Sequence, residues 1–318
     1  ETVRPNPFLH YRLEVTFFNG DTVLVVPGYY AGDGQGGPEG NKWRVRFRPD
    51  TTGEWSYRVS FRKGNQIAVH DDPEAGEPVP SLDGVSGSFR VKSSDKTGRD
   101  FRAKGRLEYV GKPHLRFAET GEYFLKGGAN SPENFLAYTQ FDNTYRMGDN
   151  RSDSTFEKLT EPLHRYQPHL QDWNTGDPTW QDGKGKQIIG ALNYLASEGM
   201  NSVYMLIMNI EGDGRDVFPY VDPTDFTRFD VSKLAQWEIV FDHMQQLGLM
   251  MHLVTQETEN ELLLDDGDTG LHRKLYYREL IARFGHHLAV TWNMGEENGP
   301  ADFSPEGQTT GQQKAMIE

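Results

Sequence analysis

The stretch DVSKLAQWEIVFDHMQQLGLMMHLVTQ, residues 230–256, joins a helical pattern directly to the pattern of a buried strand. Asp230 or Ser232 can cap the start of the helix, and a glycine ends it. The apolar residues at helical spacing are Leu234, Trp237, Val240, Phe241, Met244 and Leu247. The nearly continuous apolar run that follows is typical of a strand with both faces buried. The stretch therefore predicts a helix over 230–248 and a strand over 249–256.

The same alternation continues on both sides of this stretch. Helical spacing predicts helices over 186–199 and 271–285, and apolar runs predict strands over 123–128, 201–209 and 287–294. The resulting β-α-β-α-β-α-β order predicts a parallel sheet with right-handed crossovers. Polar clusters follow each strand, which is the catalytic face of a TIM (β/α)8 barrel and the ligand side of an open doubly wound sheet. Because no glycine-rich phosphate loop follows the first strand, we expect the barrel.

The first part of the chain has a different pattern. Short alternating or aromatic-rich runs separated by turn signals predict an antiparallel, Ig-like β-sandwich over residues 1–92. The predicted strands are 11–18, 22–30, 42–49, 54–62 and 87–92. Residues 93–104 form a polar linker, and 105–318 form the α/β domain, beginning with a hairpin. The long segment 129–185 is predicted to be a functional loop region.

Only four β/α units of an eight-unit barrel fit within the sequence. The last residues, QTTGQQKAMIE (308–318), have the pattern of the opening turns of one more helix. A half-barrel alone would expose two sheet edges. We therefore expect the remaining half of the barrel from a further C-terminal part or from a second chain.

Composition limits the possible functions. The 318 residues are 36% hydrophobic and 25% charged, as in a globular protein, and no apolar run has the length of a membrane span. The net charge of −14 argues against nucleic acid and anionic membrane as partners. The absence of cysteine excludes disulfides and thiol chemistry. The chain begins at Glu1 without a methionine, and we expect a secreted or periplasmic bacterial protein.

The candidate catalytic residues lie in TWNMGEENG, residues 291–299, at the end of the last predicted strand. A carboxyl group that acts as a general acid must hold its proton near neutral pH. Repulsion between Glu296 and Glu297, together with burial beside Trp292, would raise a carboxyl pKa in this way. The alternative is a solvated acidic loop. No G-x-S-x-G motif and no metal-ligand spacing of His, Asp and Glu occurs along the sequence, so neither a serine nucleophile nor a metal or cofactor is predicted.

Polar residues after the other strands are candidate substrate contacts, although each has a structural alternative. Asn130, Glu133 and Asn134 follow the first strand and could instead cap a helix. Loop tryptophans can stack on sugar rings or simply pack the loop. The candidates are Asn130, Glu133, Asn134, Trp173, Trp180, Asn209, Gln256, Glu257, Trp292, Asn293 and Asn298.

Several stretches carry a resemblance to a known family. NPFLHYRLEVTF and FRPDTTGEWSYRVSFRKGNQIAV are similar to the DUF5060-type N-terminal β-sandwich. YFLKGGANSPENFLAY, GMNSVYMLIMNIEGDG and FGHHLAVTWNMGEEN resemble the glycoside hydrolase barrel of clan A that accompanies it. Related bacterial proteins often carry a further β-domain with a collagen-binding or collagenase-like name.

The resemblance implies roles for particular residues. In its W-x-x-G-N-E pattern Trp292, Gly295 and Glu297 match, so Glu297 would be the general acid/base. Glu296 stands where the family has an asparagine that hydrogen-bonds the sugar 2-hydroxyl, a role that Asn293 or Asn298 would take over. The nucleophile glutamate of such enzymes comes from the seventh strand, beyond residue 318.

Two functions follow from this resemblance. The first is a retaining glycoside hydrolase that cleaves O-glycosidic bonds of a poly- or oligosaccharide. The alternative is a non-catalytic carbohydrate- or extracellular-matrix-binding protein with a degenerate barrel, suggested by Glu296 and by the missing half. A collagen-directed peptidase has no zinc motif, Cys or Ser site in this sequence to support it.

Overall fold

The computed structural model describes residues 5–148, 157–300 and 305–318. The N-terminal part is an antiparallel sheet of six strands, in the order β3-β2-β1-β4-β5 with β6 also paired to β4. Its elements are α1 (Pro7–His10), β1 (Tyr11–Asn19), β2 (Thr22–Tyr30), β3 (Trp43–Val45), β4 (Gly53–Lys63), η1 (Ile67–Val69), β5 (Glu77–Pro78) and β6 (Ser86–Val91). This confirms antiparallel strands in the first ninety residues.

One face of this sheet has its own aromatic core. The buried residues Leu13, Val15 and Phe17 of β1 lie on the face that also carries Trp55 and Phe61 of β4. The segment after β3 crosses this face, and Phe47 stacks on Phe17 with ring centroids 3.9 Å apart. The strand predicted over 42–49 is therefore confined to Trp43–Val45. Among the described residues the pairing joins the strands into one sheet and does not separate them into two sheets.

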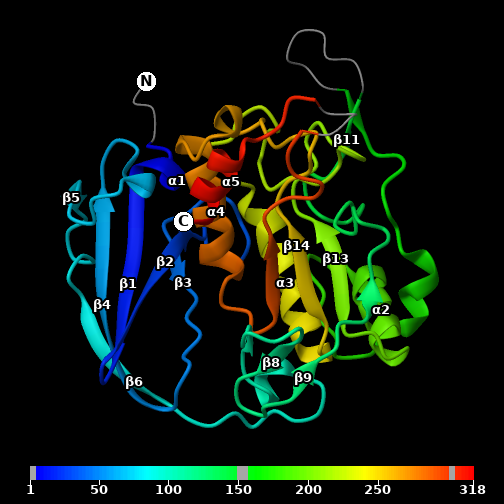
Figure 1. The fold of residues 1–318 in the computed structure, drawn as a ribbon, viewed down its shortest axis with the longest axis horizontal. Coiled ribbons are helices and arrows are strands. Elements are labelled where there is room, and N and C mark those ends of the chain that lie inside the picture. Colours follow the sequence, from blue (N-terminus) through cyan, green and yellow to red (C-terminus); the bar gives the residue numbers. More distant parts are fainter. Residues whose placement is uncertain (1–4, 149–156, 301–304) are drawn as a thin grey trace.

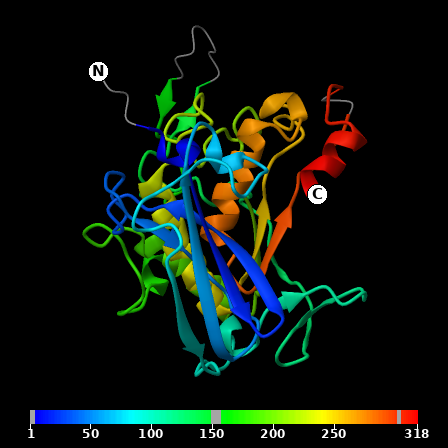
Figure 2. The ribbon, with the colours of Figure 1, turned by 90° about the vertical axis from the view of Figure 1, so that its left-hand side faces the viewer.

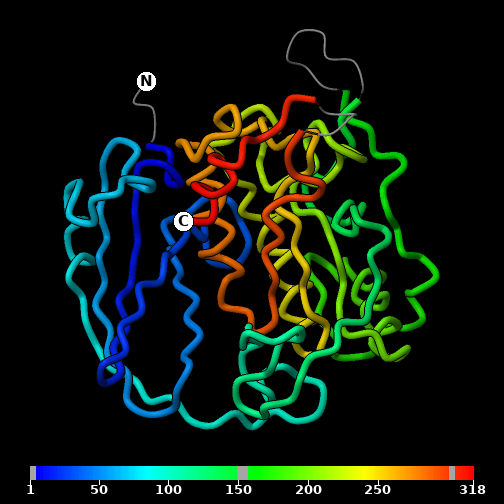
Figure 3. Tube along the Cα trace, viewed as in Figure 1, coloured from blue at the N-terminus to red at the C-terminus, as the bar shows by residue number. Residues whose placement is uncertain are grey.

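A small antiparallel meander follows the connecting segment. It consists of β7 (Leu107–Glu108), β8 (Leu115–Phe117) and β9 (Tyr123–Phe124), after the 3-10 turn η2 (Phe101–Ala103). Phe101, Phe117 and Phe124 pack together against Met250 and Ala289, at the amino ends of two later strands. Figure 3 shows the chain passing along the lower edge of the molecule into this meander. The strand predicted over 123–128 is thus wrong in its position, because Tyr123–Phe124 pairs with β8.

The second sheet has four parallel strands in the order β10-β13-β14-β15. Its strands are β10 (Gly128–Ala129), β13 (Ser202–Leu206), β14 (Met250–Val254) and β15 (Val290–Asn293). The helices are α2 (Lys186–Ser197), α3 (Val231–Leu247), α4 (Leu271–Phe284) and α5 (Thr310–Ile317). The shorter elements are β11 (Arg146–Met147), β12 (Lys158–Leu159), η3 (Gln167–Asp172) and η4 (Asp265–Gly267). The predicted β/α alternation is confirmed, whereas the described residues form a four-stranded sheet and not a closed barrel.

Helix α3 shows why the alternating pattern folds in this way. The Asp230 side chain caps the helix by accepting a hydrogen bond from the Lys233 amide at 3.0 Å, and Gly248 ends it in the left-handed conformation. Leu234, Trp237 and Phe241 are at most 1% exposed. Burial of each such side chain stabilises the fold by about 1.5–3 kcal/mol. They pack with Val203, Met205, Met251 and Leu253 of the sheet in the main core.

The two faces of the parallel sheet therefore differ. Side chains that alternate toward the helices join the main core, and the opposite face carries Tyr204 and His252, which pair across β13 and β14 and are only half-buried. In Figure 1 the loops after the strands gather at the upper end of this sheet, and the meander lies at its lower end. Any site made by these loops lies at the carboxyl ends of the strands.

Helix α4 attaches the N-terminal sheet to the parallel sheet. Arg278 donates to Glu14 Oε1 at 3.0 Å and to the Leu13 carbonyl at 2.9 Å, and Arg283 donates to the Tyr30 carbonyl at 2.9 Å. Figure 2 shows the N-terminal sheet in front of these helices. In the part of the chain that is described, no helix is both long and apolar enough to cross a membrane.

Candidate carboxylate site at the strand ends

An acidic residue lies in the loop after each of the four parallel strands. Glu133 follows β10, Asp213 follows β13, Glu257 follows β14 and Glu296 follows β15. Glu133, Asp213 and Glu257 each place one carboxylate oxygen within 4.8 Å of the others. Glu296 pairs with Glu257 in an isolated parallel bridge, and its amide donates to the Gln256 carbonyl at 3.0 Å. Carboxylates separated by long sequence distances thus meet at one end of the sheet.

Glu257 is the most buried of these acids, with 4% of its surface exposed. Its Oε1 accepts the Asp213 amide at 3.3 Å, and its Oε2 accepts from Asn260 Nδ2 at 3.4 Å. The glycine at position 212 makes this approach possible, because a Cβ there would lie 2.0 Å from Glu257 Oε2. The loop after β13 is therefore built against the Glu257 carboxyl group.

Burial and neighbouring charges make Glu257 a weak acid. Desolvation raises its pKa most, the Asp213 amide opposes that rise, and the charges of Glu259, Asp213 and Glu133 add to it, so that the pKa reaches about 9. The pKa of Glu133 is also raised, first by burial and then by Glu296. At neutral pH Glu257 therefore carries a proton.

The adjacent residues Glu296 and Glu297 have different surroundings. The phenol of Tyr204 hydrogen-bonds Glu296, and burial followed by this carboxylate raises the Tyr204 pKa. Glu297 has a φ of 53° and an exposed side chain. The left-handed backbone separates the two side chains, so Glu296 faces Tyr204 while Glu297 reaches solvent. Glu296 is therefore the one of the two that lies beside the other carboxyl groups of the site.

Several candidates from the same loops have structural partners. Gln256 is 1% exposed, receives a hydrogen bond from Arg273 and donates to Gln308 Oε1 at 2.7 Å and to Asn298 Oδ1 at 3.5 Å. Trp292 pairs with Leu253 and packs against the main core on the helix side of the sheet. These contacts indicate that Gln256 and Trp292 support the loops.

Asn209, a predicted sugar contact, is fully buried and has no hydrogen-bonding capacity left. Its amide nitrogen donates to the Asp213 carbonyl at 2.7 Å and to Asp216 Oδ1 at 2.9 Å, and its oxygen accepts the amides of Asp216 and Val217. Oδ2 of Asp216 also accepts a hydrogen bond from Asn134 Nδ2 at 2.9 Å. Asn209 and Asn134 thus shape the loop that places Asp213.

The two loop tryptophans pack within the protein. Trp180 is 7% exposed, stacks on Phe141 at 5.2 Å and donates from Nε1 to the Gln140 carbonyl at 3.0 Å. The ammonium group of Lys186 lies 4.4 Å above the ring of Trp173. These positions favour the packing alternative for both rings. The candidates that keep exposed side chains at strand ends are Asn130 and Asn298, and Asn293 is half-buried.

Sequence reasoning missed two features. Tyr204 lies inside an apolar strand, where its contact with Glu296 depends on the register of three strands. A second titratable cluster, Glu238, Asp242, His286 and His287, also lies within 4.8 Å. The four-residue spacing of Glu238 and Asp242 on a predicted helix was a usable signal for one side of this cluster. The fold thus brings together His, Asp and Glu residues that show no metal-ligand spacing along the sequence.

The arrangement of the strand-end site allows two kinds of chemistry. Carboxyl groups side by side can donate and accept protons, and the oxygens of Glu133, Asp213 and Glu257 are also ligands of the kind that hard divalent cations prefer. The position at the carboxyl ends of parallel strands is where barrel enzymes carry their active sites.

The chain is similar to known proteins in part of its sequence and in its fold. Residues 1–62 match the family model described as "Domain of unknown function (DUF5060)". No curated protein matches the chain. A solved structure described as "a putative glycoside hydrolase from Bacteroides vulgatus ATCC 8482" is similar with a TM-score of 0.57 and 18% sequence identity. The similarity covers 99% of this chain and 50% of the other, so this chain spans about half the length of that protein.

Proposed function

We propose that this chain contributes the acid/base half of a retaining glycoside hydrolase that cleaves O-glycosidic bonds of a poly- or oligosaccharide. The supporting observation is the convergence of Glu133, Asp213, Glu257 and Glu296 at the carboxyl ends of four parallel strands. The fold similarity to a protein described as a glycoside hydrolase is consistent with this proposal. A polysaccharide substrate also fits the expected secreted or periplasmic location.

Glu296 is the proposed general acid/base. It lies at the end of β15, is half-buried, and is held by the Tyr204 phenol. The acid/base group of a retaining enzyme first protonates the leaving oxygen and then deprotonates the attacking water. The neighbouring Glu257, which keeps its proton at neutral pH, adds no negative charge around it. Glu297, which points to solvent, lies on the rim of the site.

The retaining mechanism needs a second carboxylate about 5–5.5 Å from the first. We propose that this nucleophile and the remaining strands of a TIM (β/α)8 barrel come from residues outside this chain of 318. The half-buried Tyr204 and His252 on the face opposite the helices are the side chains that such strands would cover. The finer proposals, a clan A barrel and a sandwich-type N-terminal domain, rest on the resemblance of the sequence.

The test uses the complete protein and a panel of plant, microbial and animal glycans. Reducing ends released by the wild-type protein, and lost in Glu296→Ala, would support the proposal. Azide should restore turnover to Glu296→Ala, because this small anion can replace water in the second step without a general base. Glycan binding without release of reducing ends would contradict the proposal and favour the non-catalytic binding alternative.

A further inference from the structure

A second cluster of ionisable side chains lies away from the strand ends, between α3 and the chain that follows α4. Glu238 and Asp242 project from successive turns of α3, and His286 and His287 come directly after α4. Each of the four offers one ligand atom within 4.8 Å of the others. His286 Nε2 lies 3.3 Å and His287 Nε2 lies 3.8 Å from Glu238 Oε1. These are nitrogen and carboxylate oxygen donors from two separate elements.

The cluster contains buried polar atoms that lack aligned hydrogen-bond partners. His287 is 0% exposed, and neither of its ring nitrogens has such a partner. Glu238 is 6% exposed, and neither of its carboxylate oxygens has an aligned hydrogen-bond partner. Nδ1 of His286 also lacks one. An unsatisfied buried polar group is costly, and each one in a native protein calls for a specific explanation.

Two separations in the cluster are close to those of a tetrahedral metal centre. Zinc binds histidine nitrogen and carboxylate oxygen at about 2.0–2.2 Å, which places neighbouring ligand atoms about 3.4 Å apart. The observed separations of 3.3 and 3.8 Å between the histidine nitrogens and Glu238 Oε1 lie near this value. Glu238 and Asp242 are four residues apart on one helix and therefore share a face.

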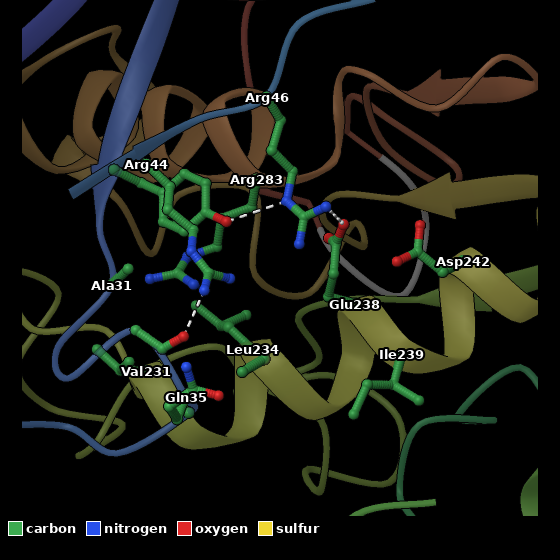
Figure 4. Close-up of a pocket in the computed structure, with 14 residues that line it drawn as sticks. Ala31, Gln35, Arg44, Arg46, Val231, Leu234, Glu238, Ile239, Asp242 and Arg283 are labelled. Carbon is green, nitrogen blue, oxygen red and sulfur yellow. Dashed lines mark hydrogen bonds and ion pairs between the residues drawn. The ribbon is translucent and has the colours of Figure 1, made fainter. Parts of the chain in front are cut away.

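Arg46 of the N-terminal sheet offers a different explanation for the burial of Glu238, because it pairs with this carboxylate. Its Nη1 lies 3.0 Å from Glu238 Oε1, and its Nε donates to the Tyr29 hydroxyl at 3.0 Å. Figure 4 shows this contact, with Asp242 one turn further along the helix. Arg46 therefore balances one carboxylate charge, but it supplies no partner for the His287 nitrogens. A cavity of about 240 Å³ lined by Arg46, Glu238 and Asp242 gives a path to the cluster.

We propose that Glu238, Asp242, His286 and His287 form a structural site for a divalent transition-metal ion, with Zn²⁺ as the best match. Imidazole ligands favour zinc and its neighbours over calcium and magnesium, which prefer oxygen alone. Four protein ligands make a closed site, which is typical of a structural metal. The ion would join α3 to the connection between α4 and β15, beside the contact with the N-terminal sheet. This inference is independent of the proposed function.

The test measures metal binding by the complete protein after dialysis against a chelator. Titration with Zn²⁺ in a calorimeter should give one ion per chain, and Co²⁺ should give the strong visible absorption of four-coordinate cobalt. Zinc at about 100 times its dissociation constant should raise the unfolding temperature by about 5 °C. His286→Gln and Asp242→Asn should each weaken Zn²⁺ binding by at least about 100-fold, because removal of a supporting residue alone costs 10–100-fold.

Glu133→Gln is the matched control, since it removes a carboxylate from the all-oxygen cluster at the strand ends. It should leave the affinity for Zn²⁺ and the Co²⁺ spectrum unchanged. Two ligand variants are included so that failure of one to fold does not remove the test. Absence of Zn²⁺ binding to the wild-type protein would overturn the proposal. So would equal binding by both ligand variants, or loss of the Co²⁺ spectrum in Glu133→Gln alone.

Discussion

Glu257 and Glu238 are both buried glutamates beside other ionisable groups, yet the pKa of Glu257 is raised and the pKa of Glu238 is lowered. Burial raises the pKa of Glu257, and the acidic neighbours Glu259, Asp213 and Glu133 raise it further, to about 9. Burial would also raise the pKa of Glu238, but His286, His287 and Arg46 outweigh it and lower the pKa to about 2. One glutamate keeps its proton at neutral pH, and the other keeps its charge.

The difference shows that neighbours, and not burial alone, separate a proton donor from a fixed anion. The strand-end cluster consists of carboxyl groups, which can donate and accept protons. The cluster behind α3 combines carboxylates with imidazoles and a guanidinium group, which holds charge in place. The strand-end cluster is therefore suited to proton transfer, whereas the cluster behind α3 is suited to joining α3 to the N-terminal sheet through Arg46.

The largest effect is expected when Glu238 loses its charge. Glu238→Gln leaves Arg46 without its counter-charge and should lower the free energy of unfolding by about 3 kcal/mol. Denaturant unfolding in the presence of a chelator measures this without any contribution from metal. The control is Glu54→Gln, which breaks the exposed pair with Arg90 at 3.4 Å and should cost less than about 0.5 kcal/mol. Equal losses of unfolding free energy in the two variants would show that the buried Glu238 pair contributes no more than an exposed ion pair.

The pH dependence of stability tests Glu257. Its pKa is raised on folding, so the native state binds a proton that the unfolded state releases between about pH 4.5 and 9. This contribution to stability is fully present below that window and is lost as pH rises through it, by at most about 1.4 kcal/mol per pH unit. Glu257→Gln should flatten this slope in unfolding experiments at several pH values. An unchanged slope would show that Glu257 is ionised at neutral pH.

Loss of the Tyr204 phenol should have an intermediate effect on activity. Tyr204→Phe removes the hydrogen bond to Glu296 and should lower kcat/KM about 10-fold, since a hydrogen bond contributes about 0.5–1.5 kcal/mol. Tyr109→Phe, at a 76% exposed position, is the control and should leave kcat/KM unchanged. Equal kcat/KM values in the two variants would show that Tyr204 does not act in the site.

The smallest effect concerns the backbone that separates Glu296 from Glu297. Glu297 has a φ of 53°, a left-handed conformation that costs a residue other than glycine about 1–2 kcal/mol. Glu297→Gly relieves this strain but frees the unfolded chain, and we expect a gain of up to about 1 kcal/mol in unfolding free energy. A loss of stability would mean that the Glu297 side chain holds the loop.

The elements with strong periodicity could be predicted from sequence. Helix α3 and strand β14 agree with the patterns in residues 230–256, because each pattern reflects burial against the main core. The first parallel strand could not be located, since Gly128–Ala129 carries no apolar signature. Its position depends on close approach to β13, where a Cβ on Gly128 would lie 1.8 Å from the Ser202 carbonyl oxygen.

The site was predictable in position but not in detail. The acidic residues after the strands follow from the β/α order, whereas the choice between Glu296 and Glu297 depends on one backbone torsion that no residue pattern specifies. The side chain of Asn209, a predicted sugar contact, makes four hydrogen bonds within the loop that follows β13. These bonds depend on the folded loop and could not be predicted from the sequence. The cluster of Glu238, Asp242, His286 and His287 escaped prediction because α3 and the connection after α4 meet only in the fold.

We propose that Glu296, and not Glu297, is the acid of the strand-end site. The most direct test compares kcat/KM of Glu296→Gln and Glu297→Gln on one glycoside that the wild-type protein cleaves. A general acid contributes about 10²–10⁴-fold to the rate. We expect a loss of this size in Glu296→Gln and a change of less than about threefold in Glu297→Gln, whose side chain is exposed. The reverse order of losses would contradict the account.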